Sequence, residues 1–201
     1  MNGLGRLVLI AAVVGGIYLF SNEGSGPEGQ LAASDIDLKR VLDVTVDTIV
    51  KVEKDIGAMP EAQKSGDAAF LLLADKLAVA YNAEQPPFDT QQIGVVPLKD
   101  ASLISYADKN KNNKREETED ALFLIEVDGQ NSRVIATSRT GAVSEHGFSG
   151  SGMLAGFLIG SMLSRQRSAG AAGSVAKKKP VSATQARARA RSGSGSHSRG
   201  K

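Results

Sequence analysis

The chain has 201 residues, with 24 Lys or Arg against 22 Asp or Glu and a formal net charge of +2. It contains no Cys and only two His, which excludes a disulfide framework and Cys-based zinc sites and argues against a His-containing catalytic triad. Aromatic residues make up 4% of the chain and Trp is absent, so platforms for stacking bases are scarce. The sequence also has no G-x-x-x-x-G-K-[ST] phosphate loop and no G-x-S-x-G nucleophile elbow. We therefore expect a protein that is not an enzyme.

Charge is distributed unevenly along the chain. No Asp or Glu follows Glu145, and ten of the 24 basic residues lie in 165–201, which leaves 14 basic and 22 acidic residues in 1–164. An acidic body with a basic tail predicts that the tail meets a membrane or nucleic-acid surface.

The N-terminal segment 1–21 contains a run of 14 uncharged, mostly apolar residues, LVLIAAVVGGIYLF, preceded by Arg6. That length suits a signal peptide, and the flanking uncharged residues bring it close to the length of a membrane-spanning helix. The nearest small-x-small site, 24–26, would place Pro27 just after the cut, so an uncleaved signal anchor is favoured over a cleaved signal. Residues 22–33 then form a Gly- and Ser-containing linker.

Residues 34–146 are predicted to form a small α+β domain with one or two helices and a β-hairpin. The first segment, 35–56, has apolar residues at helical spacing but also alternating β-branched residues, so helix is favoured and strand stays open. Ser34 with Asp37 resembles a helix N-cap box, and Pro60 suits the first turn of a second helix over 60–82. The helical stripe of the first segment consists of Leu38, Leu42, Thr45, Ile49, Val52 and Ile56.

The second half of this domain has strand patterns. SLISY at 102–106 predicts a short strand, and 121–127 alternates like a strand with a turn at Asp128-Gly129. The chain returns as a strand over 133–137.

Between these strands, 108–119 read DKNKNNKREETE, with oxygen-bearing side chains at alternating positions. This spacing resembles an EF-hand-type calcium loop over these 12 residues, because Ca²⁺ takes six to eight oxygen ligands. Asn113 stands where the family has Gly, and Lys and Arg side chains nearly cancel the acidic ones, so we expect weak binding, on the order of 10⁻⁴ to 10⁻³ M. The alternative is a solvated polar turn. The resemblance implies as ligands Asp108, Asn110, Asn112, the backbone carbonyl of Lys114, Glu116 and Glu119.

A second uncharged segment, 147–164, reads GFSGSGMLAGFLIGSMLS. Its glycines Gly152, Gly156 and Gly160 recur every four residues and would form one face of a helix, the pattern of close packing between membrane helices. We expect a second membrane helix that pairs with a copy of itself or with the first; a flexible linker or an interfacial hairpin is the alternative.

The remaining segment, 165–201, has two Val and no Leu, Ile, Met or aromatic residue, and is therefore predicted to be disordered. Basic side chains beside a span favour the cytoplasmic side and attract anionic lipid, RNA or DNA without sequence preference. The alternative is that the tail only sets topology and solubility. The residues expected to contact lipid or polyanion are Arg165, Arg167, Lys177, Lys178, Lys179, Arg187, Arg189 and Arg191.

Together these patterns predict a non-enzymatic, membrane-anchored scaffold or interaction module of a bacterial envelope, tuned by calcium. The 34–146 domain would lie outside the cytoplasmic membrane and the tail in the cytoplasm. One alternative is a membrane-tethered polyanion binder that acts through the tail. A further alternative is an exported hydrolase using the acidic cluster of Glu116, Glu117, Glu119 and Asp120.

Overall fold

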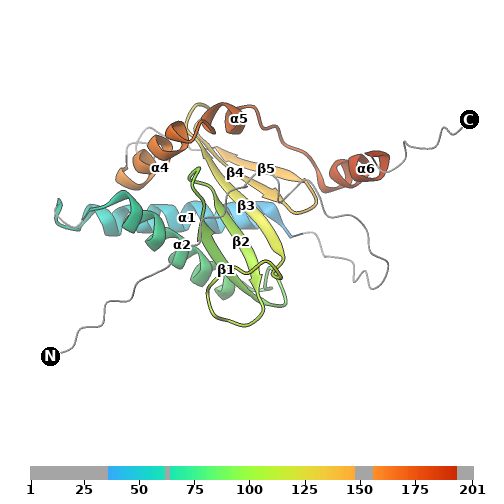
Figure 1. Ribbon diagram of the computed structural model, residues 1–201, viewed down its shortest axis with the longest axis horizontal. Coiled ribbons are helices and arrows are strands. Elements are labelled where there is room, and N and C mark those ends of the chain that lie inside the picture. Colours follow the sequence, from blue (N-terminus) through green and yellow to red (C-terminus); the bar gives the residue numbers. More distant parts are fainter. Residues whose placement is uncertain (1–35, 62–63, 148–155, 194–201) are drawn as a thin grey trace, which may run out of the picture. The chain divides into compact units, whose positions relative to one another are not determined.

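The computed structural model describes residues 36–61, 64–147 and 156–193 (Figure 1). Within these residues the fold is α+β, as the sequence predicts, with helices packed on a five-stranded antiparallel sheet. The predicted anchor 1–21 and linker 22–33 lie outside the described residues. The elements are α1 (Leu38–Gly57), α2 (Gly66–Ala83), β1 (Gln92–Pro97), β2 (Leu103–Asp108), β3 (Ala121–Asp128), β4 (Arg133–Ser138), β5 (Val143–Gly147), α4 (Phe157–Ser168), α5 (Ala172–Ala176) and α6 (Ala183–Gly193).

Helix α1 settles the ambiguity of 35–56 in favour of helix. All six residues of the predicted stripe are buried, together with Val41 and Thr48. Asp37 is the N-cap, and its carboxylate accepts hydrogen bonds from the backbone N–H groups of Lys39 and Arg40. Helical packing therefore outweighs the strand propensity of the β-branched residues, because every fourth or third side chain reaches the same core.

Helix α2 begins at Gly66, six residues later than Pro60. Ser65 occupies the N-cap with extended backbone, so that Pro60 lies before the helix and does not start it. The side of α2 that faces the protein carries Phe70, Leu73, Leu77 and Tyr81, all buried.

The strands follow one another in the order β1-β2-β3-β4-β5, each antiparallel to the next. The predicted strands 102–106, 121–127 and 133–137 are confirmed as β2, β3 and β4. The predicted turn after β3 is also present, and the Asp128 carboxylate accepts hydrogen bonds there from the N–H groups of Gln130 and Asn131. Edge strands β1 and β5 were not predicted.

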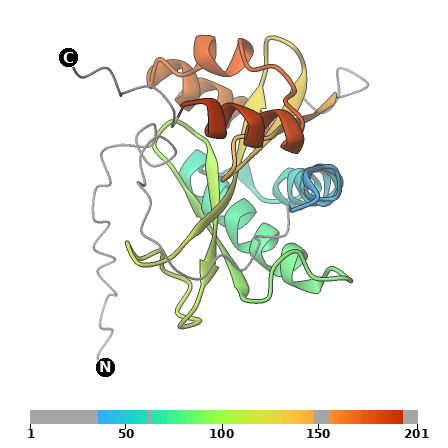
Figure 2. The ribbon, with the colours of Figure 1, turned by 90° about the vertical axis from the view of Figure 1, so that its right-hand side faces the viewer.

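One face of the sheet forms the main core with α1 and α2 (Figure 2). Helix α1 packs against β4 and β5, whereas α2 packs against β1. At the centre, Tyr81 of α2 meets Phe88 and Phe123 edge to face, with ring centroids 5.9 and 5.2 Å apart. These aromatic contacts fix the position of α2 over the sheet.

The other face of the sheet is covered in part by the C-terminal segment. By strand alternation, Glu126 points away from Phe123 and Ile125, which belong to the main core. Glu126 is buried and pairs with Lys178, which follows α5. Burial raises the pKa of Glu126, and the Lys178 ammonium counteracts this.

Both edges of the sheet carry a blocking contact. On β1, the Asn82 side-chain amide accepts from the Ile93 N–H and donates to the Ile93 carbonyl, each at 2.8 Å. On β5, Val143 exchanges two backbone hydrogen bonds with Val181, at 2.8 and 2.9 Å. These bonds occupy groups that an edge strand would otherwise offer to another chain.

Residues 157–164 differ from the predicted second membrane helix. Helix α4 begins only at Phe157, and its Leu158, Ile159 and Met162 join the core formed with α1 and α2. The apolar side chains are therefore used within the domain. Across the described residues, no helix combines the length and apolar content needed to cross a membrane.

The prediction of disorder from 165 onward is also wrong for the described part of the segment. The end of α4, α5 and α6 account for most of 165–193. Small apolar residues such as Val175 and Ala186 are buried there, and long-range ion pairs join Lys178 to Glu126 and Arg165 to Asp67.

Candidate functional site

The predicted calcium loop connects β2 to β3. Asp108 is the last residue of β2, and β3 begins at Ala121. The two ends are held together because the Ala107 N–H donates to the Asp120 carbonyl at 3.0 Å, next to the pairing of Tyr106 with Ala121. The loop is therefore closed at its base by the antiparallel sheet rather than by two helices.

The Asp108 carboxylate fixes the path of the first half of the loop by hydrogen bonds. The side chain is fully buried, and its two oxygens accept the backbone N–H groups of Asn112 at 3.1 Å and Asn113 at 2.8 Å. This folding puts Asn113 in the left-handed region, with φ of 56°. Asn tolerates that conformation better than most residues do, which explains how it can stand in for the usual Gly. Lys111, with φ of 59°, adopts the same region without that advantage.

The side chains predicted as ligands at the third, fifth and ninth positions meet one another. The Glu116 carboxylate accepts hydrogen bonds from the side-chain amides of Asn110 at 3.1 Å and Asn112 at 2.9 Å. The oxygens of those two amides accept backbone N–H groups, Asn110 from Asn112 and Asn112 from Lys114. The three side chains thus converge on the inside of one turn.

Glu119 closes the loop from its end. It is 4% exposed, and its carboxylate oxygens accept the backbone N–H groups of Lys109 and Glu116 at 3.1 and 3.0 Å. A carboxylate held at the base of the loop by two amides is well placed to act as the final, bidentate ligand of a cation.

Cationic side chains surround the loop on its outer side. Lys109 and Arg139 both pair with Asp120, each at 3.2 Å.

Burial lowers the pKa of Arg115, whereas Glu119 and Tyr106 counteract that effect. Burial also raises the pKa of Tyr106, and the carboxylates of Asp108 and Glu119 raise it further. The Tyr106 phenol is therefore neutral beneath the loop.

The donor set fits Ca²⁺ in its chemistry: three carboxylates, two amide oxygens and one backbone carbonyl amount to at least six oxygen ligands. Within the described part of the chain, however, no three His, Cys, Asp or Glu side chains are gathered as a preformed metal site. The amides of Asn110 and Asn112 present nitrogen to Glu116. A half-turn of each amide would present oxygen instead, but it would also break the bonds that these oxygens accept from the backbone N–H groups of Asn112 and Lys114.

The acidic residues of the hydrolase alternative do not form a matched pair of free carboxylates. Glu116 and Glu119 accept the hydrogen bonds described above, and Asp120 pairs with Lys109 and Arg139. Glu117 is exposed.

The described part of the predicted glycine face, Gly156 and Gly160, does not lie within one helix. Gly152 falls within 148–155, outside the described residues, and Gly156 is the N-cap of α4 rather than a residue within it. A Cβ at Gly156 would lie 2.1 Å from a Glu53 carboxylate oxygen, and that oxygen accepts the Ile159 N–H at 2.9 Å. The close approach at Gly156 is therefore made by a side chain of α1 that caps α4. No described atom lies within 4 Å of a Cβ built at Gly160.

The predicted lipid- and polyanion-binding residues are divided between half-buried residues with an ion-pair partner and exposed residues. Arg165 pairs with Asp67 and lies 5.5 Å from the centre of the Phe70 ring, and Lys178 pairs with Glu126. The exposed members are Arg167, Lys177, Lys179, Arg187, Arg189 and Arg191.

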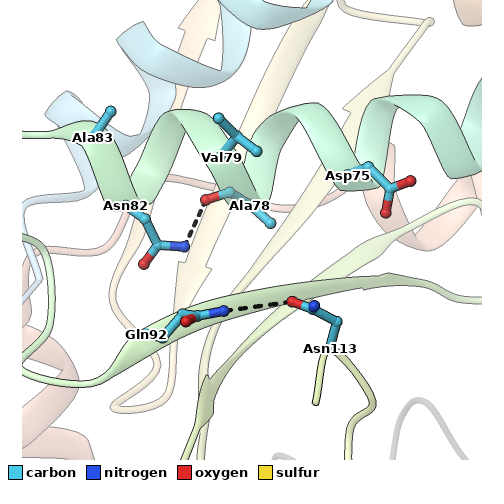
Figure 3. A pocket seen from close by; sticks show the side chains of 7 residues that line it. All are labelled: Asp75, Ala78, Val79, Asn82, Ala83, Gln92 and Asn113. Atoms are coloured by element: carbon cyan, nitrogen blue, oxygen red, sulfur yellow. Dashed lines mark hydrogen bonds between the residues drawn. The ribbon is translucent and has the colours of Figure 1, made fainter. Parts of the chain in front are cut away.

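A groove that the sequence did not indicate adjoins the loop. It has a volume of about 710 Å³ and lies beside the C-terminal half of α2 and β1, with Asn113 of the loop at its rim. Figure 3 shows Asn82 turned from α2 toward β1, and Gln92 hydrogen-bonded to Asn113 at 3.4 Å. The one sequence signal for it is the unusually apolar outer side of α2. The remaining lining residues are Asp75, Ala78, Val79 and Ala83.

Comparisons with known proteins give no further guide to this site: no family model, no curated protein and no solved structure matches the chain.

Proposed function

We propose that the chain is a non-enzymatic, membrane-anchored interaction module whose 108–119 loop binds Ca²⁺. The observation that carries the calcium proposal is the path of the loop. Asp108 holds two consecutive amides, Asn113 takes the left-handed conformation at the sixth position, and Glu119 lies buried at the twelfth. An EF-hand-type loop needs this path to direct its oxygens to one ion.

The strength of binding follows from the charges. Three ligand carboxylates attract the cation, while the neighbouring lysines and Arg115 oppose it. The side-chain amides must also give up their bonds to Glu116. Affinity on the order of 10⁻⁴ to 10⁻³ M, the range of extracellular modules, follows from these opposing terms.

The anchor proposal rests on the apolar run 7–20 and on the acidic composition of the segment after it. Basic residues favour the cytoplasmic side, so that Arg6 stays inside and the acidic domain outside. The packing of α4 against α1 and α2 supports a single span, with the C-terminal helices on the same side of the membrane as the domain. Millimolar calcium outside the membrane would then reach the loop.

Isothermal titration of the full chain in nonionic detergent tests the calcium proposal. Wild type should take up one Ca²⁺ with the affinity given above, and Glu119→Gln should lose at least tenfold because the bidentate carboxylate is removed. Glu117→Gln is the matched control, since Glu117 is exposed beside the ligands and is not one of them. An absence of heat at about 10 mM Ca²⁺, some tenfold above the weakest expected dissociation constant, would overturn the proposal.

A second candidate function is polyanion binding by the C-terminal helices. It is favoured by the exposure of Arg167, Lys177 and Lys179 in a segment without any acidic residue. Binding to RNA that weakens steeply with salt, with no binding to anionic vesicles, would support this function. Equal binding by a Lys177→Glu, Lys179→Glu double variant would contradict it.

A further inference from the structure

Helix α2 carries large apolar side chains outside the side that the described residues bury. Leu73, Leu77 and Tyr81 are buried against α1 and the sheet. On other sides of the helix, the side chains of Leu71 and Val79 are 54% and 69% exposed. Large apolar side chains exposed on one side of a helix and bordered by polar ones give the outer side of α2 the character of an interface.

The outer residues follow the spacing of a helix-packing seam. Ala68, Leu72, Asp75, Val79 and Ala83 are separated by four, three, four and four residues, and Leu72, at one border of this seam, also packs against the core. Leu72 is partly buried and the other four are exposed. Asp75, Val79 and Ala83 also line the groove beside β1 (Figure 3).

The seam is complementary to the same seam on a second, antiparallel copy of α2. If two copies of α2 cross antiparallel about a twofold axis between Asp75 and Lys76, Leu72 of each copy meets Val79 of the other, and Ala68 meets Ala83. The same axis places Asp75 of each copy opposite Lys76 of the other, which forms two equivalent ion pairs. Both side chains are exposed and no ion pair within the described residues uses either one.

We propose that the outer side of α2 is the interface of a symmetric dimer of this chain. The interface is isologous, because one patch supplies both surfaces. Its apolar pairs provide the attraction, and the central Asp75 and Lys76 fix the antiparallel direction and the register. This inference is independent of calcium binding, since the seam contains no residue of the 108–119 loop.

Reversing the charge at Asp75 or at Lys76 tests the proposed dimer. Full chains carrying different affinity tags are mixed in nonionic detergent and their co-purification is measured. Asp75→Lys alone and Lys76→Asp alone each replace two attractive pairs by two repulsive ones, and each should weaken self-association by about tenfold or more. Mixing the two variants recreates attractive pairs at both positions, so the mixed dimer should recover the wild-type level.

A second comparison tests the apolar part. Val79→Glu should dissociate the dimer, whereas Val50→Glu, at a 49% exposed position on α1, should leave it intact. Circular dichroism and the Tm establish that each variant is folded. Monomeric wild type at about 100 μM, where even a weak dimer of micromolar dissociation constant would form, overturns the proposal. Self-association that survives both charge reversals overturns the proposal as well. This result is expected if the N-terminal apolar run drives the association or if the outer side of α2 binds lipid.

Discussion

A hydrogen bond joins the hydroxyl groups of Thr45 in α1 and Tyr81 in α2. It allows a prediction about stability that depends on which hydroxyl is the donor. The Thr45 hydroxyl donates to the Val41 carbonyl at 2.6 Å, and its single proton is thereby used. The Tyr81 hydroxyl, 2.7 Å away, must therefore donate to the Thr45 oxygen. Both residues are fully buried, Thr45 at 0% and Tyr81 at 1% exposure.

Removing the two partners should therefore have unequal effects. Thr45→Val keeps the shape but leaves the Tyr81 hydroxyl buried without an acceptor, at a cost of about 1–3 kcal/mol. Tyr81→Phe removes only the donor, because Thr45 keeps its bond to Val41, and should cost about 0.5–1.5 kcal/mol. The double variant has no unsatisfied hydroxyl and should be more stable than the sum of the single effects predicts by about 1–2 kcal/mol.

Thermal and urea unfolding of the four proteins measures this cycle. For a domain of this size, each kcal/mol shifts the Tm by about 2–4 °C, so Thr45→Val should lower it by about 2–12 °C. Burial raises the pKa of Tyr81, against a smaller lowering by Thr45, so the phenol stays neutral and the cycle should give the same result at about pH 6 and about pH 9. Strictly additive effects would refute the energetic coupling of the two hydroxyl groups, and a larger loss for Tyr81→Phe than for Thr45→Val would refute the assignment of donor and acceptor.

Two further predictions concern the sheet. Lys178→Met should destabilise the protein by about 1–3 kcal/mol at neutral pH by leaving the buried Glu126 charge unpaired. Because burial raises the pKa of Glu126, this loss should shrink as the pH falls and the carboxyl group becomes protonated; an equal loss at about pH 4 and about pH 8 by urea unfolding would contradict the pairing. Gly94→Ala should cost about 1–3 kcal/mol, since its Cβ would lie 2.2 Å from the Tyr106 ring. Gly57→Ala, with open space around it, should raise the Tm or leave it unchanged, and equal Tm losses for both variants would refute the contact.

The parts of the fold that the sequence predicts are those with a strong local pattern. The stripe of α1 is one, because each apolar position faces the same core. The β3–β4 hairpin is another, since it combines alternation with a turn sequence. In contrast, β1 contains Gly94 and Pro97, and β5 is polar and half exposed. Both edge strands depend on pairing with a neighbouring strand, which a local pattern does not express.

The C-terminal part was misjudged for a related reason. An uncharged run of 18 residues resembles a membrane helix, but only the positions from Phe157 onward form α4, and they bury their apolar side chains against α1 and α2. The basic segment after it has no Leu, Ile, Met or aromatic residue, so its order depends on partners distant in sequence. Arg165 pairs with Asp67, and Lys178 with Glu126.

For the candidate site, the sequence predicts which residue types the loop contains but not which atoms meet. Spacing identifies Asp108 and Glu119 as the first and last ligands, and both lie buried at the base of the loop. The amide hydrogen bonds from Asn110 and Asn112 to Glu116 depend on rotamers that a sequence does not specify. The groove beside α2 was missed because it is formed by three separate elements.

Thermal unfolding of the full chain with and without about 10 mM Ca²⁺ tests the central claim most directly. A dissociation constant of 10⁻⁴ to 10⁻³ M corresponds to about 1.4–2.7 kcal/mol of added stability, a rise in Tm of about 3–10 °C. Mg²⁺ should give a smaller rise because it needs a more rigid, octahedral site, and Glu119→Gln should lose the Ca²⁺-dependent rise whatever its own Tm. A Tm unchanged by Ca²⁺, or raised equally by Mg²⁺ and in Glu119→Gln, would contradict the proposed calcium site.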